Sequence, residues 1–282
     1  MDWLDWCLEL MLRLRVCMSA AESSVGRMGM GTIVVGGRGR EGGSSVSPEE
    51  SKEVLVRPRT GEEAAAAFGS VSCVAFDVDS TVSTEEGIDE LAAALGAGEA
   101  VAAWTKKAMG GDVTFQEAIA ARLALIKPTK GAVEEHLAAS PAELTEGMEE
   151  LIAALHAAGK KVVFVSGGLL PLIRPLAEKL AVGEIYAIDL YFDDAGDFLD
   201  FDRRAPTAAT GGKAIVLESL RERYGSVAMV GDGVTDVEAA PYADVMVGFG
   251  ANVVRQPVKD NCDWWVESTA PLLQAVVDHQ PL

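Results

Sequence analysis

The sequence predicts an α/β fold, with a Rossmann-like parallel sheet as its core and a helical cap inserted after the first strand. Two patterns predict it. Short apolar runs that end in glycines or carboxylates alternate with helical segments, which is typical of a parallel sheet covered by helices. The alternation is interrupted once, by residues 85–144, which carry helical patterns and no convincing strand pattern. We expect this segment to form a lid over the strand ends.

The composition is that of an acidic globular protein. The 282 residues are 49% hydrophobic and 24% charged, which is enough to bury a sizeable core. The net charge of −19 argues against a nucleic acid or an anionic membrane as a partner. The four cysteines show no C-x-x-C or metal-binding spacing, so we expect a reducing compartment rather than a disulfide scaffold.

Residues 1–46 are predicted to lie outside the folded part. Residues 1–18 have the spacing of a short amphipathic helix, but charges interrupt it and it cannot span a bilayer. Two interpretations stay open for residues 1–46: a disordered tail, or a transit-like segment with an atypically acidic start. The expected compartment is therefore the plastid stroma or the cytoplasm. We expect the core to comprise residues 47–84 and 145–282, with helices that begin near Ser47 and Thr60.

The first core strand is predicted over Val71–Val78, and its end carries the chemistry. Asp77 and Asp79 follow the apolar run at a spacing of two, and Ser80 and Thr81 come next. At the carboxyl end of a parallel strand the chain turns, so both carboxylates can converge on one site. One carboxylate can attack phosphorus and ligate a hard cation, and the other can donate and accept a proton. Two solvated loop aspartates are the alternative for this motif alone.

Four helices are predicted in the cap: Ile88–Leu95, Glu99–Met109, Thr114–Ile126 and Lys130–Ala139. Glycines and prolines separate them. The cap also contributes Glu86 and Arg122, which, considered alone, are more typical of a solvated helix face.

After the cap, a helix over Gly147–Ala158 and a buried strand over Lys161–Val165 resume the alternation. The strand is followed by Ser166-Gly167-Gly168, where backbone N–H groups can approach a phosphate. The remaining predicted elements are a helix Leu169–Leu180, a strand Ile185–Ile188, a hairpin Leu190–Phe192 with Phe198–Phe201, a helix from Gly211 to Tyr224, strands Val227–Val230 and Val245–Phe249, a loop with Arg255 and Lys259, an edge strand Trp264–Val266 and a helix Thr269–Val277.

Two more signals lie in this second half. Lys213 stands near a helix start, where anions bind. Gly231-Asp232-Gly233-Val234-Thr235-Asp236 follows a buried strand, although Asp232 and Asp236 alone also suit a plain turn. D-x-D-S-T, S-G-G, the lysine and G-D-G-x-T-D thus occur in one order, each at a strand end or a helix start. The four together are far more specific than any one of them.

With these motifs, the segment from Val71 to Trp265 resembles the haloacid dehalogenase superfamily of phosphotransferases. Within it, the chain is similar to the branch that hydrolyses O-phospho-L-serine. Further similar stretches are Ala108-Met109-Gly110-Gly111, Arg122-Leu123-Ala124-Leu125-Ile126 and Pro206-Thr207. The resemblance implies Mg²⁺-dependent hydrolysis of phosphoserine to serine through an aspartyl-phosphate, the last step of serine biosynthesis.

The resemblance also assigns roles. It implies that Asp77 is the nucleophile, that Asp79 is the general acid/base, and that Asp77, the Asp79 main-chain carbonyl and Asp232 hold Mg²⁺. Asp236 supports the lysine and the metal. Three residues are implied to grip the phosphoryl oxygens: Ser166, Gly167 and Lys213.

On the substrate side, the resemblance implies that Glu86 meets the ammonium group and Arg122 the carboxylate. A zwitterion needs one fixed anion and one bidentate cation, and the arginine fork matches a carboxylate. Four further residues are implied to line the site: Met109, Gly110, Thr235 and Arg255.

Two alternatives stay open. The chain can act on another small phosphomonoester or transfer phosphate to a second alcohol, although Glu86 with Arg122 disfavours sugar phosphates. It can also be an inactive relative kept as a binding protein, but Asp77, Asp79, Lys213 and Asp232 are all present. A homodimer is left open as the assembly.

Overall fold

The structure, a computed structural model, describes residues 60–109 and 113–279. These residues fall in one compact unit that spans Val56–Leu282. The predicted tail and the helix predicted from Ser47 lie outside the described residues. Within the described ranges, no helix is both long and apolar enough to cross a bilayer.

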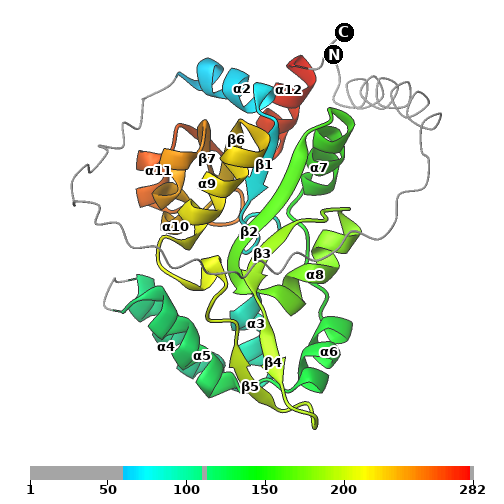
Figure 1. The fold of residues 1–282 in the computed structure, drawn as a ribbon, viewed down its shortest axis with the longest axis vertical. Coiled ribbons are helices and arrows are strands. Elements are labelled where there is room, and N and C mark those ends of the chain that lie inside the picture. The colour runs from blue at the N-terminus through cyan, green and yellow to red at the C-terminus, as the bar shows by residue number, and fades with distance from the viewer. Residues whose placement is uncertain (1–59, 110–112, 280–282) are drawn as a thin grey trace, which may run out of the picture. The chain divides into compact units, whose positions relative to one another are not determined.

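Six parallel strands form the core sheet, in the order β3-β2-β1-β6-β7-β8 (Figure 1). The strands are β1 (Cys73–Phe76), β2 (Lys161–Leu169), β3 (Ile185–Ile188), β6 (Val227–Gly231), β7 (Val245–Phe249) and β8 (Trp264–Val266). β1 pairs in parallel with β2 on one side and with β6 on the other. The predicted α/β fold is confirmed. The three strands that carry the acidic and Ser-Gly-Gly motifs lie side by side.

Helices cover the sheet on both faces, as a parallel sheet requires. On one face, Val216, Leu217 and Leu220 of α9 (Gly212–Tyr224) are buried among alternate side chains of β1, β2 and β6. Helices α2 (Gly61–Ser70), α7 (Met148–Ala157) and α12 (Ala270–Asp278) pack together, and Figure 1 shows α7 and α12 on the other side of the sheet. Helix α8 (Leu170–Lys179) packs on β2 and β3.

Four helices lie between β1 and α7: α3 (Gly87–Ala94), α4 (Gly98–Met109), α5 (Phe115–Ile126) and α6 (Lys130–Ala139). Local signals fix their ends. The Thr114 hydroxyl accepts a hydrogen bond from the Glu117 N–H, and the Glu117 carboxylate accepts one from the Thr114 N–H, which is a capping box at the start of α5. These helices occupy the segment predicted to be a cap; the exact domain boundaries stay a prediction.

The hairpin of β4 (Leu190–Phe192) and β5 (Phe198–Phe201) packs with these helices (Figure 1). Leu190 and Phe201 share a buried cluster with Leu91, Ile119 and Leu123. The sequence predicted the hairpin but assigned it to the core. Its apolar inner face shows that it completes the hydrophobic interior of the cap.

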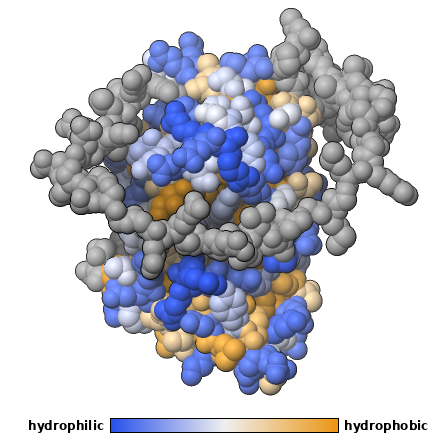
Figure 2. All heavy atoms as spheres, viewed as in Figure 1, coloured by the Kyte–Doolittle hydropathy of each residue, from blue (hydrophilic) through white to orange (hydrophobic). Residues whose placement is uncertain are grey.

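The outer face of this region also carries apolar side chains. Leu125 on α5 is 45% exposed and Leu199 on β5 is 62% exposed. Figure 2 shows apolar surface in the part of the view where Figure 1 places α5, β4 and β5.

Two predictions of local structure need correction. β2 continues to Leu169, so Ser166, Gly167 and Gly168 lie within the end of the strand, where its register with β3 shifts. The predicted loop around Lys259 contains a short helix, α11 (Gln256–Asn261), and Pro257 in its first turn suits a helix start. A second short helix that was not predicted, α10 (Val234–Glu238), begins directly after the Gly231-Asp232-Gly233 turn.

Candidate active site

The predicted catalytic residues converge where the central strands of the sheet have their carboxyl ends. Asp77 follows β1, Asp232 follows β6, and Ser166 lies near the end of β2. Because these strands are adjacent and parallel, their carboxyl ends meet, which is where open α/β sheets bind ligands. Lys213 comes from the first turn of α9, and Asp236 from α10. The four charged residues are buried.

Lys213 joins two of the aspartates. Its Nζ lies 2.8 Å from Asp77 Oδ2 and 2.6 Å from Asp236 Oδ1. Burial alone would lower the pKa of Lys213, but the charges of Asp236 and Asp77 outweigh burial and raise the pKa above its usual value. The lysine therefore carries a positive charge beside Asp77 at neutral pH. Asp77 Oδ1 accepts a hydrogen bond of 2.7 Å from the Val78 N–H, which fixes the carboxylate.

Asp232 is another strongly buried carboxylate of the site. Its Oδ1 accepts from the Thr81 hydroxyl at 3.1 Å, and its Oδ2 accepts from Arg255 Nε at 2.8 Å. Burial and the negative charge of Asp77 raise the pKa of Asp232 to about 6 even though Arg255 opposes the rise. This carboxylate is therefore short of compensating positive charge.

The oxygen atoms of Asp77, Asp232 and Asp236 are placed to hold a cation. One oxygen from each lies within 4.8 Å of the other two. Carboxylate oxygens are the ligands that hard divalent cations such as Mg²⁺ prefer. The donor set therefore fits a metal ion, and it includes the Asp236 side chain, for which the resemblance implied only a supporting role.

Asp79 lies apart from that carboxylate group, beside Ser166. Its Oδ1 accepts from the Gly87 N–H at 2.8 Å and its Oδ2 from the Ser166 hydroxyl at 3.3 Å. Burial and the charges of Glu86 and Asp77 raise the pKa of Asp79 to about 7, although the Gly87 N–H and Lys213 favour the carboxylate. Near neutral pH this group can therefore exist in both protonation states.

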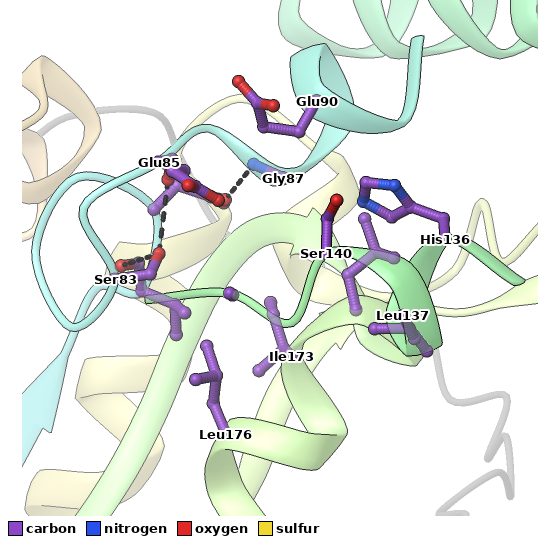
Figure 3. Close-up of a pocket in the computed structure, with 13 residues that line it drawn as sticks. Ser83, Glu85, Gly87, Glu90, His136, Leu137, Ser140, Ile173 and Leu176 are labelled. Atoms are coloured by element: carbon purple, nitrogen blue, oxygen red, sulfur yellow. Dashed lines mark hydrogen bonds between the residues drawn. The ribbon is translucent and has the colours of Figure 1, made fainter. Parts of the chain in front are cut away.

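A small cavity of about 30 Å³ reaches Asp79 from the side of α6 and α8. Figure 3 shows His136 and Ser140 of the α6 end, Glu85 and Glu90 of the α3 side, and Ile173 and Leu176 of α8 around it. Asp77, Asp232 and Lys213 do not line it. The cavity therefore reaches the site only at Asp79 and is separate from the group of Asp77, Asp232 and Lys213.

Two charged residues of the cap segment lie near the carboxyl ends of these strands. Glu86 Oε1 accepts from the Ser80 hydroxyl at 2.9 Å and from an Arg255 terminal nitrogen at 3.1 Å. Arg122 on α5 is only 9% exposed, and its Nε has no hydrogen-bond partner. Within the described part of the chain, no carboxylate forms an ion pair with it. Burial lowers the pKa of Arg122, against the opposing charges of Asp89, Glu86 and Asp79.

Comparison with known proteins decides the family. Residues 71–244 match the haloacid dehalogenase-like hydrolase family. A phosphoserine phosphatase from Bos taurus is 44% identical over 213 residues, which are 74% of this chain and 95% of that protein. The chain belongs to the haloacid dehalogenase-like hydrolases.

Two further relatives extend the comparison. The chloroplastic phosphoserine phosphatase of Arabidopsis thaliana is 44% identical over 213 residues, 73% of this chain and 72% of that protein. A solved structure of a phospho-aspartyl intermediate analogue of phosphoserine phosphatase is 28% identical, covers 73% of this hydrolase and 99% of the solved chain, and has a TM-score of 0.65. The sequence and structure comparisons therefore agree on the family.

The other predicted site residues are placed as follows. Gly167 lies under the α5 side chain Phe115: a Cβ atom on Gly167 would be 2.6 Å from Phe115 Cζ. Thr235 lies on α10 next to Asp236. Gly110 and the Met109 side chain lie outside the described residues. The cap segment of this hydrolase thus contacts the Ser166-Gly167-Gly168 segment through Phe115.

Sequence reasoning missed Asn252, and it missed the contacts of Gly168 and Thr81. A side chain on Gly168 would collide with Asp79 Oδ2, so this glycine leaves room for the Asp79 carboxylate. Thr81 binds Asp232, and Asn252 binds the main-chain oxygen of Ser80. Gly168 and Thr81 were visible in the sequence as parts of motifs, but nothing pointed to these partners; Asn252 gave no signal.

Proposed function

We propose that this hydrolase converts O-phospho-L-serine and water to L-serine and phosphate. The observation that carries the proposal is Arg122, a buried guanidinium in the cap segment. Asp89, Glu86 and Asp79 attract its charge, but it has no ion-pair partner among the described residues. Because an unpaired buried charge is costly, such a group is best explained by an anion that the substrate brings. The phosphoserine phosphatases among its relatives support the same substrate.

The reaction proceeds in two steps on the chain's own residues. An Asp77 carboxylate oxygen attacks phosphorus, the phosphorus–oxygen bond to the seryl oxygen breaks, and the seryl oxygen takes a proton from Asp79. Asp79 then accepts a proton from water as the water oxygen attacks the aspartyl-phosphate, which releases phosphate and restores Asp77. Asp79 suits this role by position, two residues from the nucleophile and fixed by Gly87 and Ser166.

Charge neutralisation is the other requirement of phosphoryl transfer. Lys213 touches Asp77 and would bind a phosphoryl oxygen, and the Ser166 hydroxyl with the Gly167 N–H would bind the others. Asp77, Asp232 and the Asp79 main-chain carbonyl would hold Mg²⁺, with Asp236 as a further nearby carboxylate. When bound, the ion would offset the charge of the clustered carboxylates and of the phosphate.

Recognition of serine needs the two cap charges. Arg122 would bind the substrate carboxylate through two parallel hydrogen bonds. Glu86 would bind the ammonium group: both hydrogen bonds that its carboxylate accepts from described residues use Oε1, which leaves Oε2 for the substrate. Met109, Gly110, Thr235 and Arg255 are proposed to line the remaining surface of the site.

A substrate series that removes one charge at a time tests this proposal. Phosphate release is measured from O-phospho-L-serine, phosphoethanolamine (no carboxylate), phosphoglycolate (no ammonium) and glucose 6-phosphate, each with Mg²⁺ and with EDTA. We expect phosphoserine to exceed each analogue in kcat/KM by roughly 100-fold or more, because each lost pair removes a charge-assisted contact. Similar values for phosphoserine and glucose 6-phosphate would refute the substrate, and full activity in EDTA would refute the metal.

The compartment and assembly remain proposals as well. We propose the plastid stroma or the cytoplasm, and a fluorescent protein fused to residues 1–59 would distinguish the two by its location. A homodimer is proposed as the assembly, and light scattering that gives the monomer mass at micromolar concentration would refute it.

A further inference from the structure

Asn252 lies in the loop between β7 and α11, and its side chain reaches both segments that join the cap to the core. Its Nδ2 donates to the Thr145 hydroxyl at 2.7 Å. It also donates to the main-chain oxygens of Ser80 and Ser83, at 3.1 Å and 3.3 Å. Ser83 belongs to the segment that leaves β1 for α3, and Thr145 to the segment that returns from α6 to α7. One amide group thus contacts both connecting segments, which we call the cap crossings.

The two crossings are also bonded to each other. Ser83 and Leu144 form an isolated antiparallel bridge. The Thr84 N–H donates to the Glu143 carbonyl at 3.0 Å, and the Thr145 N–H donates to the Val82 carbonyl at 2.9 Å. Asn252 therefore ties a third segment, the β7–α11 loop, to this pair.

The same network continues to the carboxylates of the site. The Thr145 hydroxyl donates to the Thr81 carbonyl at 2.7 Å, so its oxygen accepts the hydrogen bond from Asn252. The Thr81 hydroxyl in turn donates to Asp232 at 3.1 Å. Thr81 and Thr145 are buried, so water does not readily replace these bonds.

Asn252 also holds a strained turn. Ser80 has φ of 55°, in the left-handed region that non-glycine residues rarely adopt. Such a conformation persists when its surroundings fix it, and here Asn252 binds the Ser80 carbonyl. The turn directly follows Asp77 and Asp79, so its shape sets where both carboxylates point.

We propose that Asn252 is a positioning residue, through which the two cap crossings and the catalytic turn are held in one arrangement. It acts on Asp77, Asp79 and Asp232 through the Ser80 carbonyl and through Thr145 and Thr81. The inference rests on the proposed phosphatase activity of the site but not on which phosphate ester is the substrate.

Asn252→Asp is the main test, because it keeps the size of the side chain and replaces the NH₂ donor by an acceptor that faces three oxygens. Asn261→Asp is the matched control: Asn261 is exposed and donates only to the nearby Pro257 carbonyl. Hydrogen exchange of the Thr84 and Thr145 amides is measured without substrate, and kcat and KM are measured on phosphoserine and on p-nitrophenyl phosphate.

In Asn252→Asp we expect these two amides to exchange at least about tenfold faster. We expect kcat to fall at least about tenfold on both esters while KM stays within about threefold, since the loss concerns the placement of reacting groups and not substrate contacts. Asn261→Asp should match wild type in both measurements.

Thr145→Val and Thr145→Ser keep the proposal testable if Asn252→Asp does not fold. The serine keeps the hydroxyl and should retain wild-type kcat, whereas the valine should reproduce the loss. Wild-type kcat and local exchange in Asn252→Asp, or in Thr145→Val, would overturn the proposal. So would faster exchange across the whole sheet with unchanged kcat, which would indicate a general role in stability. A wild-type enzyme that hydrolyses p-nitrophenyl phosphate but not phosphoserine would refute the proposed substrate and leave this test intact.

Discussion

The carboxyl ends of the core strands and the cap segment hold their cations differently. At the strand ends, the buried Lys213 is paired with Asp77 and Asp236, and the half-buried Arg255 with Asp232. In the cap, Arg122 is buried as well, yet no ion pair joins it to another described residue. Because an unpaired buried charge destabilises a fold, the difference indicates that the carboxylate site at the strand ends is assembled without substrate, and it supports our proposal that the substrate carboxylate pairs with Arg122.

The first prediction concerns Asp77, which is paired with Lys213 at the strand ends. Asp77→Asn should lower kcat at least about 1,000-fold, because an amide oxygen is a poor nucleophile and a poor metal ligand. The measurement is phosphate release, together with mass spectrometry of the acid-quenched enzyme for a phosphorylated Asp77 peptide.

The exposed Asp194→Asn provides a control with the same chemical change and should retain wild-type turnover. Undiminished turnover in Asp77→Asn, or a phosphorylated peptide elsewhere in the chain, would show that another residue is the nucleophile.

The second prediction compares the two buried cations by stability. Lys213→Met should lower the free energy of unfolding by about 3–5 kcal/mol, because it leaves Asp77 and Asp236 close together without their counter-charge. Arg122→Met should instead raise it by about 1 kcal/mol, because a buried charge without a partner is removed. Urea unfolding of the metal-free, substrate-free protein measures both.

Opposite signs would support the contrast between the two regions. If Arg122→Met were destabilised as much as Lys213→Met, Arg122 would be paired in the free protein and the contrast would be wrong.

The smallest effect concerns a charge pair away from the site. Burial alone would raise the pKa of Glu184, but hydrogen bonds from Arg223, Tyr224 and Tyr186 outweigh it and lower the pKa below its usual value. A lowered carboxyl pKa gives stability that is present above the unfolded value, near 4.5, and is lost as the pH falls through the folded value.

Glu184→Gln should therefore lower the free energy of unfolding by about 1 kcal/mol at pH 7, a modest value because Arg223 is half exposed to screening solvent. The difference should shrink as the pH falls below 4.5, the usual pKa of a glutamate, and kcat at pH 7 should not change. A loss of stability that does not depend on pH would mean that packing, and not charge, is responsible.

Sequence patterns predicted the strands, turns and helices, which depend on neighbouring residues, and missed contacts between residues that are far apart in the sequence. The strand before Asp77, the turn with Asp232 and the helix with Lys213 are each marked by adjacent residues, and parallel strands bring such ends together. Even β8, an edge strand of only three residues, all of them apolar, was predicted.

The misses have a common cause. Asn252 bonds to Ser80 and Thr145, far away in the sequence, and a single asparagine in a loop has no periodicity to reveal this. The hairpin was visible, but the partner of its apolar face was not, since alternation tells only that one face is buried. The short helix α11 had only Pro257 as a signal, and a proline suits a loop equally well.

Arg122→Ala, measured on two substrates, tests most directly whether the substrate carboxylate pairs with Arg122 of the cap segment. For phosphoserine we expect a loss of roughly 30- to 1,000-fold in kcat/KM, which corresponds to about 2–4 kcal/mol for a buried bidentate contact. For p-nitrophenyl phosphate, which has no carboxylate, the loss should be within about threefold. Arg122→Lys should recover only part of the activity on phosphoserine, because an ammonium cannot form the two-pronged contact. Equal losses on both substrates would mean that Arg122 maintains the fold of the cap, and near wild-type values on both would mean that it is not in the site at all.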